Sequence, residues 1–434
     1  MDEFVESIRE LTTRFPLNED DAAQLVDKIM AQRYSPQPYL GVAINGRGDV
    51  YFYLQRLGAG SYGTVYSASA DGSRTAQFVV KEFSLPDTQR SLPLQTPDSG
   101  DDSEPVQEDE HDDYEFRDGY VETEYRITAF IEEQLGARFC RESAICAVER
   151  FYSRDRKQGF IVFPFAGTMT LMRYLPQKIG SQMLRVRQMI ADANLVGQSL
   201  DTIRELARGA PGRESQDAAR IVREVARIQD ECIYLAQYLV QTLTQLHSIG
   251  VAHSDLKPEN VLVENGKPKL IDFGISCAVP ASDDAPVNDP RYMYIWCGER
   301  FTTTNFMEDP LAARVRAKRN TVKREMFTKF DTYSMGKLIQ MIFDNGTYTP
   351  SGRLARFPIV RQTLFMPRGI YDLIVTMTGE SNYSPPILSD GSYNLSLTPT
   401  EFATRLARYE RRPTMQRVQE QFDAIFYAWN NEQE

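Results

Sequence analysis

Apolar residues recur at two different spacings along this chain, and each spacing predicts its own kind of element. Behind Asn18, a residue suited to cap a helix, the apolar positions repeat at helical intervals: Ala22, Leu25, Val26, Ile29 and Met30. From Tyr39 the pattern changes to YLGVAI, the turn sequence NGRGD and then VYFYLQRL. These segments predict a strand, a hairpin turn and a second strand, so a β-rich region begins near Tyr39.

Further along, the chain passes from this β-rich region into almost continuous helix. The strand FVVKEF is followed by a stretch rich in Pro, Ser and acidic residues, 86–118, which we expect to be a disordered insertion. Helical spacing returns at Tyr120, strands return between residues 144 and 165, and from Leu171 onward the pattern is nearly all helical. The order predicts an α+β fold with a small β-rich lobe followed by a larger helical lobe.

The composition is that of a soluble globular protein, with 434 residues of which 42% are hydrophobic and 25% charged. A formal net charge of -11 argues against direct nucleic-acid binding, and no apolar run reaches membrane-spanning length. The acidic N-terminus lacks the apolar stretch of a signal peptide, and the five cysteines form no C-x-x-C pair. Both features favour a cytoplasmic or nuclear location and buried or incidental thiols, and the net charge favours proteins and nucleotides as partners.

The first chemical motif is a G-x-G-x-x-G sequence formed by Gly58, Gly60 and Gly63. Glycines at this spacing let backbone amides approach phosphate oxygens closely. The motif alone is weak, because it also marks dinucleotide-binding folds. Here the residues after the glycines continue as a strand rather than a helix, and a further strand leads to Lys81. We therefore expect Lys81 to lie under the glycine turn and to neutralise phosphate charge.

A second cluster, HSDLKPEN followed by DFG, is far more specific. Phosphoryl transfer needs a group that accepts or orients the hydroxyl proton, a cation beside the moving phosphoryl, and oxygen ligands for Mg²⁺. Asp255, Lys257 and the pair Asn260 with Asp272 supply these needs in that order. Two short strands joined by an Asn-Gly turn separate the two ligands in sequence, and the hairpin places both ligands at one end.

Together these motifs resemble the eukaryotic-type protein kinase family over residues 51–430. The resemblance implies a bilobal protein kinase fold that binds ATP between its lobes, uses Mg²⁺ and phosphorylates serine or threonine on protein substrates. The implied roles are phosphate cover for Gly58, Gly60 and Gly63, phosphate binding for Lys81, catalytic base for Asp255, the cation for Lys257, and magnesium binding for Asn260 and Asp272. Lysine at the position of Lys257 is the feature that resembles serine/threonine kinases.

The same resemblance implies that a helix glutamate pairs with Lys81. Two candidates, Glu122 and Glu124, lie in the segment YVETEYRITAFIEEQL. Glu124 shares a helix face with Ile127 and Ile131, so its side chain points inward with the apolar stripe. We predict Glu124 as the partner and keep Glu122 as the alternative.

The segment IVFPFAG resembles the hinge of the family, where adenine binds to backbone groups. Phe163 is the implied gatekeeper. Pro164 lacks an N–H but keeps its carbonyl as an acceptor, and Ala166 supplies an N–H donor. The apolar residues implied to enclose the adenine ring are Leu57, Val65, Val79 and Leu262.

The resemblance divides the chain into three parts with several insertions. The parts are an N-terminal helical extension with the start of the β lobe (1–50), an N-lobe (51–165) with the acidic insertion 86–118, and a C-lobe (166–430) with a helical insertion (176–230) and a basic insertion (300–327). The basic insertion is a candidate docking place for an acidic partner, although a solvated helix face explains its charges as well.

Two other functions fit parts of the sequence. A pseudokinase scaffold usually lacks one of the four residues Lys81, Asp255, Asn260 and Asp272, and all four are present. A small-molecule kinase of the aminoglycoside type shares a His-x-Asp loop, and Ser254 favours that alternative slightly. The glycine motif and the lysine after the catalytic aspartate favour an active protein kinase.

Overall fold

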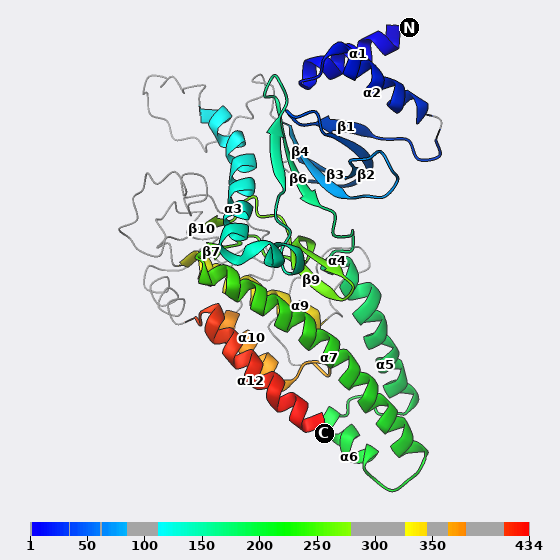
Figure 1. Cartoon of the computed structure of the whole chain (residues 1–434). Helices are drawn as coiled ribbons and strands as arrows, with labels where there is room; N and C mark the ends of the chain where they lie inside the picture. The colour runs from blue at the N-terminus through cyan, green and yellow to red at the C-terminus, as the bar shows by residue number, and fades with distance from the viewer. Residues whose placement is uncertain are drawn as a thin grey trace, which may run out of the picture. The chain divides into compact units, whose positions relative to one another are not determined.

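The computed structural model describes residues 2–33, 35–60, 63–84, 112–278, 326–344, 363–378 and 412–433. Most of the predicted acidic insertion, nearly all of the basic insertion and the docking place predicted there lie outside these residues. The chain divides into two compact units, whose elements are shown in Figure 1. The first contains Met1–Phe130 and Ile145–Ala166, and the second contains Ile131–Ala144 and Gly167–Glu434.

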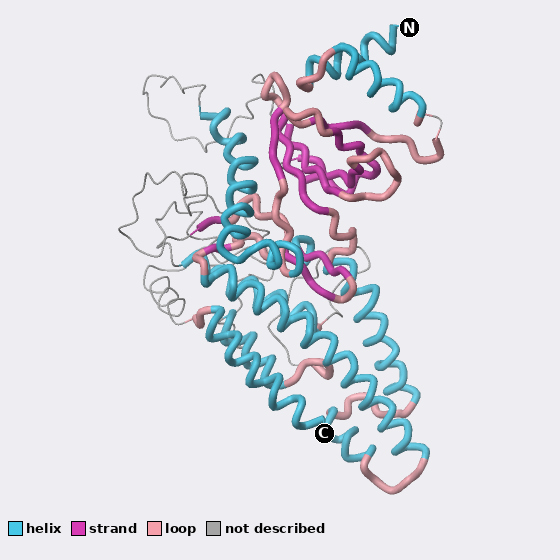
Figure 2. The backbone as a smooth tube through the Cα atoms, in the orientation of Figure 1, coloured by secondary structure: helices cyan, strands magenta, loops and turns pink. Residues whose placement is uncertain are grey.

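The first unit is built on a six-stranded antiparallel sheet, coloured as strands in Figure 2, with the order β1-β2-β3-β4-β6-β5. Its strands are β1 (Gly41–Ile44), β2 (Val50–Gly60), β3 (Gly63–Ser69), β4 (Phe78–Ser84), β5 (Glu149–Tyr152) and β6 (Gln158–Pro164). The strands predicted from the apolar pattern are therefore confirmed. The predicted NGRGD turn joins β1 to β2, and the glycine motif spans the junction of β2 and β3.

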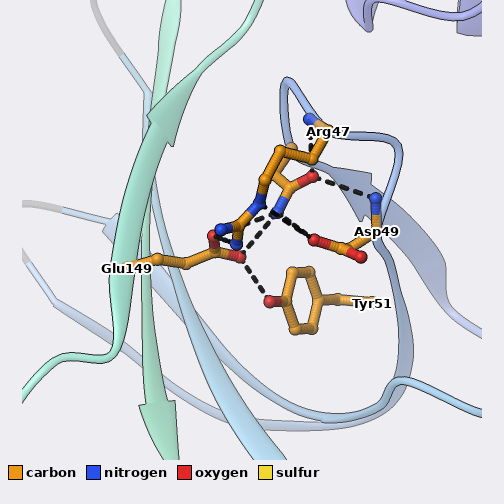
Figure 3. Close-up of polar contacts among 5 residues, drawn as sticks. Arg47, Asp49, Tyr51 and Glu149 are labelled. Carbon is orange, nitrogen blue, oxygen red and sulfur yellow. Dashed lines mark hydrogen bonds and ion pairs between the residues drawn. The ribbon is translucent and has the colours of Figure 1, made fainter.

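The sheet curls so that side chains from its two ends meet, although β1 and β5 stand at opposite ends of the strand order. Glu149 of β5 accepts hydrogen bonds from Asn45 Nδ2 at 2.9 Å, from Arg47 Nη2 at 2.7 Å and from the Tyr51 hydroxyl (Figure 3). Asn45 also donates to Asp49 Oδ2 at 2.8 Å, and its Oδ1 accepts the Arg47 and Asp49 backbone N–H groups. These five residues, here called the Glu149 clasp, tie the β1–β2 turn to β5.

Two N-terminal helices, α1 (Asp2–Arg14) and α2 (Glu19–Ala31), complete the first unit (Figure 1). The predicted cap is confirmed, because Asn18 Oδ1 accepts the Asp21 N–H at 2.7 Å. Helix α1 lies ahead of that cap and had no boundary signal of its own in the sequence. Phe15 follows α1 directly, is fully buried and belongs to the same apolar core as Leu25 of α2 and Phe160 of β6. The helical extension is therefore part of the core of this unit.

Helix α3 (Asp112–Glu142) corrects one boundary of the sequence prediction. It begins inside the segment 86–118, so residues 112–118 are helical rather than disordered. The acidic residues that suggested disorder are also favourable in the first turn of a helix, where the macrodipole is positive.

Helix α3 is interrupted at Gly136, whose φ of 81° is not helical. Residues 131–144 group with the second unit, which differs from the predicted lobe boundaries. Near the end of this segment, the Glu142 carbonyl accepts the Tyr238 hydroxyl at 2.8 Å, and Ala144 forms a parallel bridge to Leu270. These contacts, which join residues far apart in sequence, attach the end of the helix to the second unit.

The second unit is mainly helical, as the apolar spacing predicts (Figure 2). Its described helices are α4 (Leu171–Tyr174), a π-helical segment (Leu175–Gly180), α5 (Ser181–Asp192), α6 (Leu200–Ala207), α7 (Arg213–Ser248), α9 (Met326–Phe343), α10 (Arg368–Thr378) and α12 (Met415–Gln433). The predicted helical insertion 176–230 corresponds to α5, α6, the first half of α7 and part of the π-helical segment. No helix in the part of the chain that the structure describes is long and apolar enough to span a membrane.

Four short strands form two small ladders in the second unit. They are β7 (Val251–Ala252), β8 (Val261–Glu264), β9 (Lys267–Leu270) and β10 (Cys277–Ala278), with β7 paired to β10 and β8 to β9. The β8–β9 turn has φ values of 51° at Asn265 and 79° at Gly266. Two successive positive φ angles are what a two-residue hairpin turn with an Asn-Gly sequence requires.

The cysteines correct a second interpretation. Cys140, Cys146 and Cys277 are disulfide-bonded, so they are not incidental thiols. Cys232 is a free, buried thiol, and burial raises its pKa well above the usual value. Sequence spacing did not reveal the bonded cysteines because none belongs to a C-x-x-C pair.

The Glu149 clasp generates a stability prediction. Glu149→Ala leaves the buried hydroxyl of Tyr51 without its acceptor and the buried amide of Asn45 with only Asp49, so the free energy of unfolding should fall by about 2–4 kcal/mol. Urea denaturation measures this loss. Glu142→Ala is the matched control, because Glu142 pairs with Arg138 on an exposed surface and its loss should leave stability nearly unchanged. Equal losses in both variants would contradict a structural role for the clasp.

Candidate active site

The glycine motif forms the tip of the β2–β3 hairpin. Gly58 pairs with Val65, Ala59 with Thr64 and Gly60 with Gly63 across the two strands. A Cβ atom at Gly63 would lie 2.1 Å from the backbone oxygen of Glu82 in β4, whereas one at Gly58 would meet no atom within 4 Å. The close approach of β4 is therefore enough by itself to require glycine at position 63. No such contact requires glycine at position 58.

Lys81 lies within β4 beside this hairpin, because it pairs with Val65 in the adjacent strand. Its Nζ lies 2.7 Å from Glu124 Oε2 of α3. Glu122 instead forms ion pairs with Arg126 and Arg150. The structure thus joins Lys81 to Glu124, the predicted partner, and the role of this pair in binding phosphate stays a prediction.

The residues predicted around adenine lie in both units. Leu57, Val65 and Val79 are half-buried on β2, β3 and β4, and Val79 pairs with the buried Phe163 of β6. Pro164 pairs with Phe78, and the adjoining Ala166 is buried at the last position of the first unit. Leu262 is half-buried on β8 of the second unit. Their contacts with a nucleotide stay predictions.

Three of the predicted site residues meet in the second unit. Lys257 Nζ lies 2.6 Å from Asp255 Oδ2, and Asn260 Nδ2 donates to the same oxygen at 2.8 Å and to the Asp255 carbonyl at 2.9 Å. Burial raises the pKa of Asp255 above its usual value, and Lys257 opposes that rise. The cluster holds a partly desolvated carboxylate between a cation and an amide.

A buried carboxylate on α9 fixes the loop that carries this cluster. Asp331 Oδ2 accepts the His253 backbone N–H at 2.6 Å, and Oδ1 accepts the Ser254 N–H at 2.8 Å. His247 Nε2 lies 3.1 Å from the same Oδ2. Ser254 has a φ of 66°, which is uncommon outside glycine and needs such support from its surroundings. Asp331 therefore positions the backbone immediately before Asp255.

The DFG segment is tied to the same loop. The buried Phe273 lies against the His253 ring with 4.8 Å between centroids, and Ser276 Oγ donates to the His253 carbonyl at 2.8 Å. Asp272 has a φ of 64° and lies close enough to raise the pKa of Asp255 electrostatically. These contacts bring Asp272 to the Asp255 cluster across the intervening β8–β9 hairpin.

The donors available for Mg²⁺ are an amide and a carboxylate. The Asn260 Nδ2 group is engaged with Asp255, so the amide oxygen is the Asn260 atom suited to a metal, and Asp272 supplies a carboxylate. Mg²⁺ commonly takes one or two protein oxygens and completes its shell with phosphate and water. These two residues fit that pattern. Within the described ranges, no group of three or more His, Cys, Asp or Glu residues forms a separate metal site.

Sequence reasoning missed His247 and Ser276, which support the loop. The histidine is the last-turn residue of α7 and is 84 residues from Asp331, so no local pattern links the two. Arg412 donates to the Thr378 carbonyl at 3.0 Å, and its guanidinium lies 5.0 Å from the Tyr333 ring centroid. These contacts connect the segment before α12 with α10 and α9.

Comparison with known proteins shows that part of this chain is similar to a known family. Residues 210–357 match the protein kinase domain. Similar sequences occur in the serine/threonine-protein kinases AfsK of Streptomyces griseus, PKH1 of Saccharomyces cerevisiae and RUNKEL of Arabidopsis thaliana, at 37% identity over 78 residues, 35% over 82 and 45% over 77. The matches cover 17%, 18% and 17% of this chain and 10%, 11% and 6% of those proteins.

The matched domain contains the Asp255 cluster and Asp331 but neither Lys81 nor Glu124. The family match therefore does not extend to the first unit.

Asp331 generates the prediction for this site. Asp331→Asn replaces one acceptor oxygen by an N–H₂ group that faces a backbone donor, so the free energy of unfolding should fall by about 2–3 kcal/mol. Urea denaturation measures the loss. Asp372→Asn on the exposed side of α10 is the control and should leave stability nearly unchanged. A stable Asp331→Asn variant would show that the loop does not depend on this carboxylate.

Proposed function

We propose that this chain transfers the terminal phosphoryl group of ATP to serine or threonine hydroxyls of protein substrates, because residues 210–357 match the protein kinase domain. The observation that carries the proposal is the cluster in which Asp255 is bound by both Lys257 and Asn260. This cluster places a carboxylate, a cation and an amide together, as phosphoryl transfer requires.

Asp255 is the proposed base. Its Oδ2 is engaged by Lys257 and Asn260, which orients the carboxylate and directs Oδ1 toward an incoming hydroxyl. Burial raises its pKa, so the carboxylate is a better proton acceptor than an exposed aspartate. Lys257 supplies positive charge where negative charge accumulates on the moving phosphoryl group.

The first unit is proposed to anchor the nucleotide. The Lys81 ammonium is held by Glu124, whose side chain is 2% exposed, so the cation has a fixed position next to the β2–β3 hairpin. An ammonium in this position suits the α and β phosphates, and the glycine turn suits close approach of backbone amides.

Asn260 and Asp272 are the proposed Mg²⁺ ligands, and the ion when bound offsets the negative charge of the phosphates. Lys81 and the glycine turn hold the nucleotide, while Asp331 holds the backbone that presents Asp255. Serine or threonine as the acceptor follows from Lys257 and from the serine/threonine kinases that share sequence with this chain.

An assay with labelled ATP distinguishes this proposal from its alternatives. Generic protein substrates and a panel of small alcohols are offered in parallel, with phosphoamino-acid analysis of the labelled protein. Label on serine or threonine alone supports the proposal. Label on small alcohols alone favours a small-molecule kinase, and no transfer at all favours a pseudokinase scaffold.

A substitution of the proposed base is the direct test of mechanism. Asp255→Ala should lower kcat by about 10²- to 10⁴-fold, because the variant has no group that orients and deprotonates the hydroxyl. Steady-state phosphorylation with a thermal melt of each variant measures the effect and verifies folding. The exposed Asp201→Ala, remote in sequence from the cluster, should retain wild-type activity. Activity in folded Asp255→Ala equal to the control would overturn the assignment.

The raised pKa of Asp255 gives a pH prediction. The base must be ionised, so kcat/KM should fall as the pH drops through that pKa, at a higher pH than for an ordinary aspartate. Lys257 favours the ionised form, so Lys257→Met should raise the pKa further and move the acid limb to higher pH. Profiles of kcat/KM against pH measure the shift. Lys267→Met, at an exposed position of β9, is the control. An acid limb at the same pH in Lys257→Met as in the wild type would contradict the electrostatic coupling of Lys257 to Asp255.

A further inference from the structure

The C-terminal residue of α1 is bound to the strand that carries Lys81. Arg14 Nη2 lies 2.8 Å from Glu82 Oε1, and Arg14 Nε donates to Gln158 Oε1 at 2.6 Å. Gln158 Nε2 donates to the same Glu82 oxygen at 2.8 Å, and the Tyr53 hydroxyl donates to Glu82 Oε2 at 3.0 Å. The Glu82 carboxylate therefore receives three donors, one from α1, one from the neighbouring strand β6 and one from β2.

Arg14 is itself fixed by packing. Its guanidinium lies 5.1 Å from the centroid of the Phe15 ring and 5.8 Å from that of Phe160. The carbonyl of Arg14 accepts the Arg154 backbone N–H at 3.0 Å. Phe15 is fully buried, with 5.9 Å between its ring centroid and that of Phe160. The end of α1 is held by apolar, cation–π and backbone contacts, so Arg14 acts on Glu82 from a rigid support.

Glu82 is placed to affect the two nucleotide-directed parts of the first unit. Successive strand residues point to opposite faces, so the Arg14 contact lies on one face of β4 and the Lys81–Glu124 pair on the other. The Glu82 backbone oxygen is also the atom against which Gly63 packs, because a Cβ there would lie 2.1 Å away. A shift of β4 at Glu82 would therefore move both Lys81 and the seat of the glycine hairpin.

We propose that Arg14, acting through Glu82, is a positioning residue that sets the placement of Lys81 and of the glycine hairpin and so tunes the affinity for ATP. The proposal rests on the proposed function of Lys81. It gives the N-terminal helical extension a role in nucleotide binding besides its part in the core. Loss of Arg14 removes the cation from a carboxylate whose side chain is only 13% exposed, which favours displacement of Glu82 from its position.

The test compares Arg14→Ala with Arg9→Ala, an exposed arginine of the same helix, in the full chain. Initial rates are measured against ATP concentration at a fixed protein substrate, at a temperature where thermal melts show every variant folded. Arg14→Ala should raise the KM for ATP on the order of five- to tenfold with a smaller change in kcat, because ATP binding rather than the hydroxyl-directed chemistry is affected. Arg14→Lys, which keeps the charge, should recover part of the KM, and Arg9→Ala should match wild type.

A double-variant cycle with Glu82→Gln separates positioning from stability. If Arg14 acts through Glu82, the changes in KM of the two single variants are not additive in Arg14→Ala/Glu82→Gln. A lower melting temperature with an unchanged KM for ATP in Arg14→Ala would overturn the proposal, as would additive effects in the cycle.

Hydrogen–deuterium exchange tests the positioning role of Arg14 independently of the proposed function. If wild-type protein transfers no phosphoryl group, the proposed function fails, and exchange of the β4 peptide 78–84 still reports on positioning. Faster exchange in β4 of Arg14→Ala than of Arg9→Ala supports the positioning of β4 by Arg14, and identical exchange in the two variants overturns it.

Discussion

A buried carboxylate must find hydrogen-bond donors within the protein, and Asp331 meets this constraint in a way that determines the candidate active site. The side chain is 1% exposed and takes its donors from the backbone of His253 and Ser254 and from His247. Satisfying the aspartate thus fixes the backbone in front of Asp255. The DFG segment is then held through His253, whose ring and carbonyl contact Phe273 and Ser276. One electrostatic requirement in α9 therefore organises two segments of the candidate active site.

The first unit uses carboxylates in the same manner, here to hold a curled sheet. Glu149 joins strands from the two ends of the sheet, and Glu82 joins β4 to α1 and β6. Neither contact resembles an exposed ion pair, which contributes little, because each glutamate also receives a tyrosine hydroxyl from β2. Burial raises the pKa of Tyr53 strongly, and Glu82 adds to the rise, so the phenol stays protonated as a donor. These polar contacts stabilise the strand order that places Lys81 beside the glycine hairpin.

Sequence patterns predicted features that depend on near neighbours, and missed those that depend on distant ones. Alternating apolar residues located β1 and β2, the Asn-Gly dipeptide located the β8–β9 turn, and the helix stripe selected Glu124 over Glu122 as the residue that meets Lys81. The pairs Arg14–Glu82 and His247–Asp331 are separated by 68 and 84 residues, and single charged residues carry no sign of their partners. The interruption of α3 at Gly136 was equally hidden, because a lone glycine is tolerated in many helices.

The packing of Gly63 has a consequence for how loss-of-function data on this hairpin are understood. Replacing a glycine of such a motif is a common way to ask whether a protein uses a nucleotide. At position 63 any larger residue collides with the backbone of β4, so an inactive variant there reports a misassembled hairpin as readily as a lost ligand. Gly58, where a side chain has open space, separates these explanations. A motif whose members look equivalent in the sequence therefore contains one diagnostic position for ligand binding and one for folding.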